Sequence, residues 1–192
     1  MTNEPFAIFH EWYLAAVEND SSAADVMALA CSSRHGRPSC RMVSYRGIRE
    51  GGFSFFTNYE SRKGIELREN PFAALVFYWA HIGKQVRIEG RTEPLSRSES
   101  DAYFRQRSLE SRLTAVVSPQ SRLMPSENEL DTRLKRYRET EGQEPQQRPI
   151  YWGGFKVVPD RFEFWTHGDH RRHHRLLFQR DSGRWKQLLL YP

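Results

Sequence analysis

Four basic side chains are spaced so that they could bind one anion together. Arg41 and Arg46 bracket a β-like run, and Arg62 and Lys63 open a helix-like segment after the polar loop that follows FSFFTN. Because packed elements bring their ends together, we expect the four cations to cluster. Free N–H groups at a helix start also bind phosphate. Simple capping of the helix by polar residues is the alternative interpretation of this loop.

A second basic group lies in the tail segment DHRRHHR. In a strand, Arg171, His173 and Arg175 would share one face. Two guanidinium groups and an imidazole there could hold a phosphate or a carboxylate through charge-assisted hydrogen bonds. An exposed basic strand that deters edge pairing explains the same pattern equally well.

The tail is also rich in histidine, which raises the question of a metal. No Cys pair with the usual ligand spacing lies nearby, and adjacent residues of a strand point to opposite faces. We therefore predict no metal site. The histidines concerned are His167, His170, His173 and His174.

A third group is predicted on a helix that starts at Ser96. Tyr103 and Arg107 are four residues apart on one helix face, and Ser111 joins them if the helix continues. An ordinary helix surface is the simpler interpretation of this spacing. All three side chains can nevertheless hydrogen-bond a phosphate.

Strands are the main elements that must position these residues. After an amphipathic helix over 5–18, segments 24–33, 39–47 and 53–58 alternate with turn residues and are predicted to form a meander. Residues 72–80 are apolar almost throughout, as in a strand covered on both faces. A small antiparallel barrel with peripheral helices fits this pattern best.

The end of the chain returns to strands. The pattern predicts them over 151–158, 161–168, 170–180 and 184–192, with DSG as the last turn.

The composition restricts the class of protein. A chain of 192 residues fits one domain, and 38% hydrophobic with 13% aromatic residues excludes a disordered chain. The net charge of +5 rests largely on arginine, which suits phosphate and carboxylate partners. Small anions and nucleic acid both fit this charge.

The location of the protein is predicted from what the sequence lacks. No apolar run reaches the roughly 20 residues of a membrane span, and no signal sequence precedes the first helix. We expect a cytoplasmic protein, not a membrane protein. Cys31 and Cys40 are too few for a disulfide framework and are predicted to be small buried strand residues.

The chemistry points to a cofactor. No nucleophile with an adjacent base and no positioned carboxylate pair stands out. No Gly-rich nucleotide loop is present, so side chains would have to hold an anion. If the protein is an enzyme, a cofactor performs the difficult step.

Taken together, the motifs resemble those of the pyridoxine (pyridoxamine) 5′-phosphate oxidases, FMN-dependent enzymes of vitamin B6 metabolism. The resemblance runs from about residue 5 to 192. It implies one split β-barrel domain over 1–192 that forms a homodimer with two FMN molecules in interface clefts. The motifs are RMVSYR, FFTNYESRKG, ENP, KQVRIEG, the Tyr103, Arg107 and Ser111 spacing, SPQS, YWGGF, EFW and HRRHHR.

The resemblance also implies roles for individual residues. Arg171 and His173 would lie over the substrate ring and orient it and handle protons. The implied substrate-binding residues are Arg46, Tyr103, Arg107, Ser111, Arg171 and His173. The implied FMN-binding residues are Arg41, Met42, Val43, Ser44, Tyr45, Arg46, Phe56, Thr57, Ser61, Arg62, Lys63, Gln85, Gln120, Ser121, Trp165 and Arg175.

The implied reaction is the oxidation of pyridoxine or pyridoxamine 5′-phosphate to pyridoxal 5′-phosphate. A hydride passes from C4′ to flavin N5, and oxygen then takes the electrons and becomes hydrogen peroxide. The protein would clamp the substrate phosphate at one end and the ring at the other.

The chain departs from the family pattern at several positions. Arg46 stands where Lys is usual, Arg172 and His174 where Leu and Asp are common, and Leu189 where Arg is common. The chain also starts at the opening helix, without the basic N-terminal segment that closes over the substrate in many members. Slower catalysis or a larger substrate is the expected consequence.

Three other functions compete with this one. A phenazine-pathway oxidase shares the fold and FMN, but its substrate would not require the phosphate-binding set. A non-catalytic protein could hold FMN or pyridoxal phosphate as a sensor or carrier. A nucleic-acid module is the weakest, because the basic residues are assigned to a cleft and not to an exposed stripe.

Overall fold

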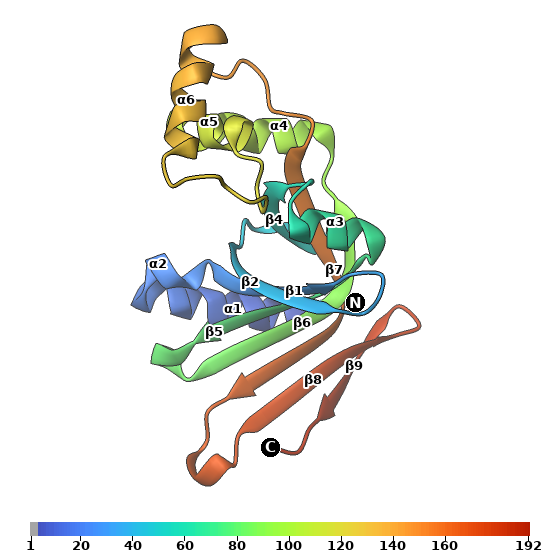
Figure 1. Cartoon of the computed structure of the whole chain (residues 1–192). Coiled ribbons are helices and arrows are strands. Elements are labelled where there is room, and N and C mark those ends of the chain that lie inside the picture. Colours follow the sequence, from blue (N-terminus) through green and yellow to red (C-terminus); the bar gives the residue numbers. More distant parts are fainter. Residues whose placement is uncertain (1–3) are drawn as a thin grey trace.

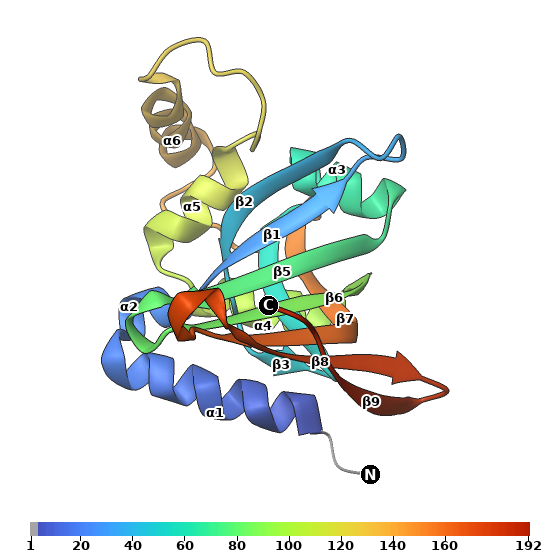
Figure 2. The same cartoon turned by 90° about the horizontal axis from the view of Figure 1, so that it is seen from below.

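The apolar spacing near the start of the chain forms the predicted amphipathic helix. In the computed structural model, which describes residues 4–192, α1 packs against the inner face of the sheet (Figure 2). Its Phe9 is fully buried, with ring centroids 4.8 Å from Phe53 and 5.0 Å from Phe77. Burying one such side chain contributes about 1.5–3 kcal/mol, so this contact ties α1 firmly to the sheet.

The chain is mainly antiparallel β with helices at its rim, as predicted (Figure 1). The helices are α1 (Glu4–Asn19), α2 (Ser21–Ala24), α3 (Arg62–Glu69), α4 (Arg97–Gln106), α5 (Leu109–Val117) and α6 (Glu129–Thr140), with 3-10 turns η1 (Ala80–Ile82) and η2 (Asp169–Arg171). The strands are β1 (Val26–Ser32), β2 (Pro38–Ser44), β3 (Ile48–Arg49), β4 (Gly52–Asn58), β5 (Phe72–Trp79), β6 (Lys84–Pro94), β7 (Trp152–Thr166), β8 (His174–Asp181) and β9 (Arg184–Leu189).

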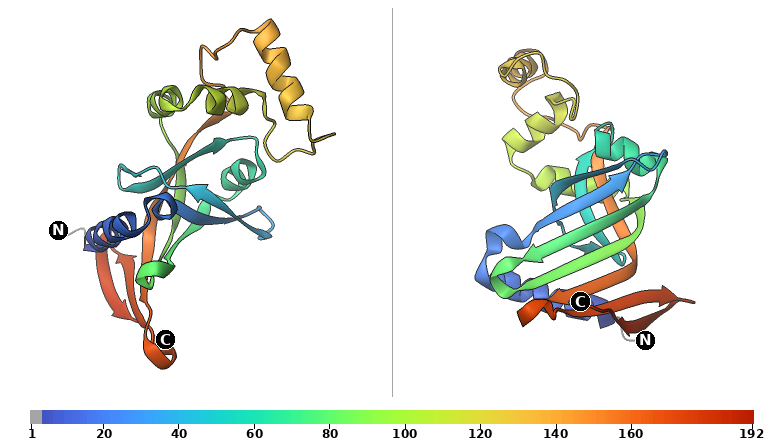
Figure 3. Two further views of the ribbon diagram at one scale, coloured as in Figure 1. Left: turned by 90° about the vertical axis from the view of Figure 1, so that its left-hand side faces the viewer. Right: turned by 60° about the horizontal axis from the view of Figure 1, so that its bottom comes forward.

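One long strand, β7, organises the sheet. The strand order is β2-β1-β5-β6-β7-β4-β3, with β8 added to β7 and β9 to β8. The first half of β7 pairs with β4 and its second half pairs with β8. On its other side, β7 pairs with β6 over the whole length of β6. Figures 1 and 3 show the consequence: α4, α5 and α6 gather at one end of β7 and the β8–β9 hairpin lies at the other.

The two strands predicted over 151–158 and 161–168 are in fact this single strand. Pro159 lies in it, opposite Gly90, where the register shifts. Proline is tolerated at such a bulge because no ladder hydrogen bond is needed there. A Cβ on Gly90 would collide with the backbone of Val158, so glycine permits the close approach.

The predicted meander is only half right. β1 and β2 form the expected antiparallel pair, but β4 pairs with β7 and β3 and not with β2. Turn residues predict a neighbour in sequence, and they carry no information about a strand from the far end of the chain. The hydrogen-bonded path from β2 to β3 does not close, so the sheet is a barrel that remains open.

Burial along β5 alternates, so this chain by itself covers one of the two faces that were predicted to be covered. Leu75, Phe77 and Trp79 are buried on the face that meets α1, whereas Phe72 and Tyr78 are 53% and 62% exposed. The second face is therefore apolar yet open within one chain.

The cysteine prediction holds for one residue of two. Cys31 is buried in β1, but Cys40 is exposed on β2, and both thiols are free. Cys40 is exposed because β2 lies at the edge of the sheet, where alternate side chains face outward. Among residues 4–192, no helix has the length and apolar character needed to cross a membrane.

Candidate active site

A cavity of about 520 Å³ lies between the barrel and the rim helices. Most of the residues predicted to bind a phosphate line it, and Ser108 and Trp152 join them without having been predicted. The lining consists of Arg41, Met42, Val43, Ser44, Arg46, Phe56, Thr57, Lys63, Tyr103, Arg107, Ser108, Ser111, Gln120 and Trp152.

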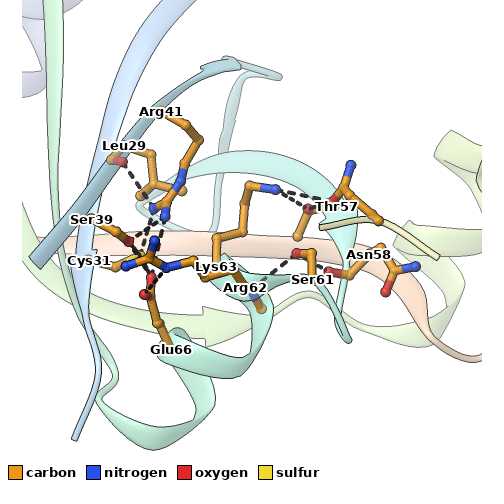
Figure 4. A network of polar contacts seen from close by, with 12 residues as sticks. Leu29, Cys31, Ser39, Arg41, Thr57, Asn58, Ser61, Arg62, Lys63 and Glu66 are labelled. Atoms are coloured by element: carbon orange, nitrogen blue, oxygen red, sulfur yellow. Dashed lines mark hydrogen bonds and ion pairs between the residues drawn. The ribbon is translucent and has the colours of Figure 1, made fainter. Parts of the chain in front are cut away.

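One end of the cavity is formed by β4, α3 and the segment after α5. Lys63 Nζ donates to Thr57 Oγ1 at 3.2 Å and to Gln120 Oε1 at 3.1 Å (Figure 4). Burial, with the nearby charge of Arg41 as the next cause, lowers the pKa of Lys63. An anion bound here would offset both causes, so this end is suited to a phosphate.

Local sequence explains why Lys63 faces the cavity. Ser61 caps α3 by accepting a hydrogen bond from the Gly64 amide at 3.3 Å, so the helix begins at Arg62. A Cβ on Gly64 would overlap the backbone of Tyr59, and glycine therefore lets the first turn sit against the preceding loop. Lys63 lies in this first turn, and its Nζ reaches Thr57 and Gln120.

The other end of the cavity is formed by Arg46 and residues from α4 and α5. Arg46 Nε donates to Tyr103 Oη at 2.6 Å, and Arg46 Nη1 donates to Asp25 Oδ2 at 3.0 Å. The Tyr103 ring stacks on Phe56, with centroids 3.8 Å apart. Arg46, one of the residues that depart from the family pattern, is thus held on two sides, which fixes the orientation of its guanidinium group.

Arg107 has a buried donor without an acceptor at this end of the cavity. Its Nη1 is buried and makes no hydrogen bond, and its guanidinium carbon lies 4.6 Å from the centroid of the Trp152 ring. Burial lowers the pKa of Arg107, and the positive charge of Arg46 acts in the same direction. A buried donor without an acceptor is costly, and an oxygen of a bound phosphate would satisfy it.

The helix does not continue to Ser111, which was the condition for Ser111 to share a helix face with Tyr103 and Arg107, yet all three residues line the cavity. α4 ends at Gln106, Arg107 is extended with ψ of 151°, and Ser108 caps α5 by accepting from the Ser111 amide. A serine that offers the next helix a cap competes with helix continuation. The resulting turn between α4 and α5 brings Arg107 and Ser111 to the cavity instead.

A second cluster of predicted residues lies across three strands. Gln85 on β6 pairs with Trp165 on β7, and Trp165 pairs with Arg175 on β8, so the three form one row. His173 lies beside this row, with its ring centroid 4.6 Å from that of Trp165. Arg175 Nε donates at 2.8 Å to the buried carboxylate of Glu163, which also accepts from Arg87.

This row lies at the opposite end of β7 from the cavity. Trp152, at the start of the strand, lines the cavity, whereas Trp165 is near its end. A strand of 15 residues rising about 3.3 Å per residue extends more than roughly 40 Å along its path. The two clusters therefore do not form one site within a single chain.

The prediction that Arg171, His173 and Arg175 share a strand face is wrong. Only Arg175 lies in β8, because Thr166 pairs with His174 and the residues between them form the hairpin loop. Arg171 belongs to η2 and has a φ of 63°. His173 Nδ1 accepts from the Gly168 amide at 3.2 Å, which holds the imidazole against the loop.

The remaining predicted residues lie outside the cavity. Tyr45 is buried in the core, Ser61 is buried as a helix cap, and Arg62 and Ser121 are exposed. Of the positions that depart from the family pattern, Arg172, His174 and Leu189 are all exposed. Within residues 4–192 no group of three or more His, Cys, Asp or Glu side chains is placed to hold a metal.

Sequence comparison identifies the family. Residues 15–141 match the model of pyridoxamine 5′-phosphate oxidase, and residues 152–192 match that of the pyridoxine 5′-phosphate oxidase C-terminal dimerisation region. The chain belongs to the pyridoxamine 5′-phosphate oxidase family. Members of this family are FMN-dependent oxidases, which confirms the predicted cofactor and reaction class.

Named relatives of the family are similar over their full length. The chain is 46% identical to the pyridoxine/pyridoxamine 5′-phosphate oxidase of Coxiella burnetii, covering 100% of this chain and 97% of that one. It is 44% identical to the corresponding oxidase of Pseudomonas putida, covering 98% of this chain and 89% of that one.

Solved structures agree on the fold. PhzG from Burkholderia lata 383, solved with tetrahydrophenazine-1-carboxylic acid, aligns with a TM-score of 0.88 at 30% identity over 98% of this chain and 92% of that one. A pyridoxamine 5′-phosphate oxidase-related, FMN binding protein from Nostoc punctiforme aligns with a TM-score of 0.79 at 19% identity over 100% and 99%. The predicted split barrel is thereby confirmed.

Proposed function

We propose that this chain oxidises pyridoxine or pyridoxamine 5′-phosphate to pyridoxal 5′-phosphate with FMN as cofactor and oxygen as the final electron acceptor. One observation carries the proposal: a single cavity has two separate cationic ends, one at Lys63 and one at Arg107. Cofactor and substrate each bring one phosphate, so the cavity offers each phosphate its own end. Residues 1–192 act as one domain in this proposal, since β7 contacts both groups of elements.

The FMN phosphate is assigned to the end formed by β4 and α3. Lys63 and Arg41 supply positive charge, and Thr57 and Gln120 supply hydrogen-bonding groups beside Lys63. Residues 42–44 on β2 form the wall along which the flavin ring would lie. Arg62, on the first turn of α3, adds charge from outside the cavity.

The substrate phosphate is assigned to the end formed by Arg46, Tyr103, Arg107 and Ser111. The unpartnered Nη1 of Arg107 is a donor that a phosphate oxygen would satisfy. Ser108, which caps α5 beside Ser111, adds a further hydroxyl to this end. Two arginines and three hydroxyl groups would both neutralise the phosphate and fix its position.

The site becomes complete only in a homodimer. Gln85, Trp165, His173 and Arg175 lie at the far end of β7, so we assign them to the cavity of the partner chain. The apolar outer face of β5, with Phe72 and Tyr78, is exposed and available to pack against a second subunit. The match of residues 152–192 to the family's dimerisation region supports this arrangement.

FMN, when bound, would supply the electron sink for a hydride from C4′, and oxygen would take up the two electrons with two protons to give hydrogen peroxide; with pyridoxamine 5′-phosphate, water would also be taken up and ammonia released. The protein contributes orientation: the phosphate end fixes the substrate at one side. At the other side, Arg171 and His173 of the partner chain orient the substrate ring and handle its protons. The Gly168 amide fixes His173 through Nδ1, which leaves Nε2 as the nitrogen that can face a substrate.

A bound-flavin spectrum followed by anaerobic reduction tests this function. The purified protein should show a flavin spectrum with FMN, and pyridoxamine 5′-phosphate should bleach it without oxygen. Absence of flavin binding after addition of FMN would contradict the cofactor assignment. Binding without bleaching would favour a phenazine-type oxidase, which the similarity to PhzG makes the second candidate, or a non-catalytic binder.

Arg107→Ala tests which end holds the substrate. The variant should raise the KM for the phosphorylated substrate by about tenfold or more, because a charged hydrogen bond to phosphate is lost. Its affinity for FMN should remain that of the wild type. An equal loss of FMN binding would show that the two ends have been assigned the wrong way round.

A further inference from the structure

One buried carboxylate, Glu66, has no role in the reaction yet contacts the cationic end of the cavity. It lies on α3, and the residue is only 5% exposed. Figure 4 shows it facing side chains from β1, β2 and the first turn of its own helix. Burying a carboxylate is costly unless several donors satisfy it.

Four donors meet the two oxygens of Glu66. Oε1 accepts from Arg62 Nε at 2.9 Å, one helical turn away. Oε2 accepts from Cys31 Sγ at 3.0 Å, from Arg41 Nη2 at 3.3 Å and from the Ser39 hydroxyl. The carboxylate thus links β1, β2 and α3 at one point.

Arg41 is held from all sides by this group. Its Nη1 donates to Cys31 Sγ at 2.8 Å and to the Leu29 carbonyl at 3.3 Å, and its Nη2 also donates to the Ser39 hydroxyl. Nε makes none of these bonds. A long flexible side chain that is fixed in this way loses no further rotamer freedom when a ligand arrives.

We propose that Glu66 is the positioning residue of the cofactor-phosphate end, because its carboxylate fixes Arg41 and Arg62 in the orientation that receives the phosphate of FMN. The inference rests on the proposed assignment of Arg41, Arg62 and Lys63 to that phosphate. Glu66 itself does not touch FMN in this proposal; it acts through the two arginines.

If Glu66 positions the arginines, removal of its charge should weaken the binding of FMN, whereas electrostatics alone predicts tighter binding. Removing a negative charge near the site makes the site more positive, so Coulomb attraction alone would tighten phosphate binding. Loss of positioning has the opposite effect, because the amide of Gln presents two donors where Glu66 offers only acceptors. One of the two arginines then loses its partner.

Glu66→Gln is tested by measuring the Kd of FMN and of riboflavin from flavin fluorescence. Riboflavin has the same ring system and lacks the phosphate, so it does not use the arginines. We expect the Kd of FMN to rise about tenfold or more, the loss of a charged hydrogen bond, while the Kd of riboflavin stays within about twofold. Glu69→Gln on the exposed face of the same helix is the matched control and should change neither value.

Two results would overturn the proposal. Tighter FMN binding by Glu66→Gln would show that the carboxylate acts only through its charge. Equal weakening of FMN and riboflavin would show a general structural role. Should Glu66→Gln fail to fold, Ser39→Ala removes the hydroxyl that bridges Arg41 and Glu66 and keeps both charges; it should weaken FMN but not riboflavin.

A further variant separates this inference from the site assignment. Lys63→Met should abolish most of the preference for FMN over riboflavin. If Lys63→Met leaves that preference intact, the phosphate has been assigned to the wrong place. If Lys63→Met removes the preference and Glu66→Gln does not, the assignment stands and the positioning role of Glu66 is wrong.

Discussion

The buried carboxylate of Glu66 should give the protein a pH-dependent stability. Burial alone would raise its pKa, but hydrogen bonds from Ser39, Cys31 and Arg62 outweigh burial and lower the pKa to about 2 from an ordinary value of 4.5. A lowered pKa contributes stability above the unfolded value, and this contribution is lost as the pH falls from 4.5 towards about 2. This difference in pKa between the folded and unfolded states corresponds to about 3 kcal/mol of unfolding free energy near neutral pH.

Urea unfolding of wild type and Glu66→Gln measures this contribution. The unfolding free energy of wild type should exceed that of Glu66→Gln by about 1–3 kcal/mol near pH 7. This difference should decrease as the pH falls below about 4. Glu69→Gln, with its exposed carboxylate, should follow wild type throughout. A gap that stays constant down to about pH 2 would contradict the proposed ionisation of Glu66.

Asp25 should affect substrate binding without touching the substrate. It accepts from Arg46 Nη1 at 3.0 Å and from Tyr13 Oη at 2.6 Å. Burial raises the pKa of Tyr13 to about 12, with Asp25 as the next cause, so the phenol stays a donor to Asp25 at physiological pH. Asp25→Asn should free Arg46 and raise the KM for the phosphorylated substrate several-fold, with the Kd of FMN unchanged. Parallel loss of FMN would place Arg46 at the other phosphate.

At the residue scale the sequence predicted cations better than the groups that hold them. Arg41, Arg46, Lys63 and Arg107 all line one cavity, because arginine and lysine near loops and helix starts are exposed by default and converge when the fold closes. The carboxylates of Asp25, Glu66 and Glu163 were missed. Nothing local marks which of 24 acidic residues turns inward, since its partners come from other elements.

At the element scale, the seat of α3 against the preceding loop gives a sharp test. Gly64→Ala would place a methyl group against the Tyr59 backbone, so either the helix or the loop must shift. We expect a loss of about 2 kcal/mol or more in unfolding free energy. FMN should also bind more weakly, since Lys63 is the neighbouring residue. Arg68→Ala, an exposed change on the same helix, is the control and should alter neither measurement.

Elements with a strong period were predictable, and their ends and connections were not. The 3.6-residue spacing of Phe9 and its neighbours correctly predicted α1, and turn residues after residue 33 correctly predicted the β1–β2 hairpin. The break between α4 and α5 and the loop before β8 depend on a serine cap and on left-handed residues such as Arg171. Such features depend on single residues, so they leave no periodic pattern in the sequence.

At the scale of the whole molecule, the order of the strands could not be predicted from the sequence pattern. The pairing of β4 with β7 joins segments that no turn connects, and the open edge between β2 and β3 follows from that pairing. The split barrel was predicted through motif resemblance, which carries the whole topology at once. Periodicity alone predicted a small antiparallel barrel with helices at its rim, without the order of its strands.

The division of the site between two chains has a direct consequence for mixtures of variants. Arg107→Ala damages the cavity half of a site, and Arg175→Ala damages the half that we assign to the partner. In a dimer with one chain of each kind, one site carries both substitutions and the other carries neither. An equal, freely exchanging mixture should therefore recover roughly a quarter of the wild-type kcat/KM, since half of the dimers are mixed and each has one intact site. If both halves came from the same chain, every site would keep one lesion, and the mixture would show only the mean activity of its two parents.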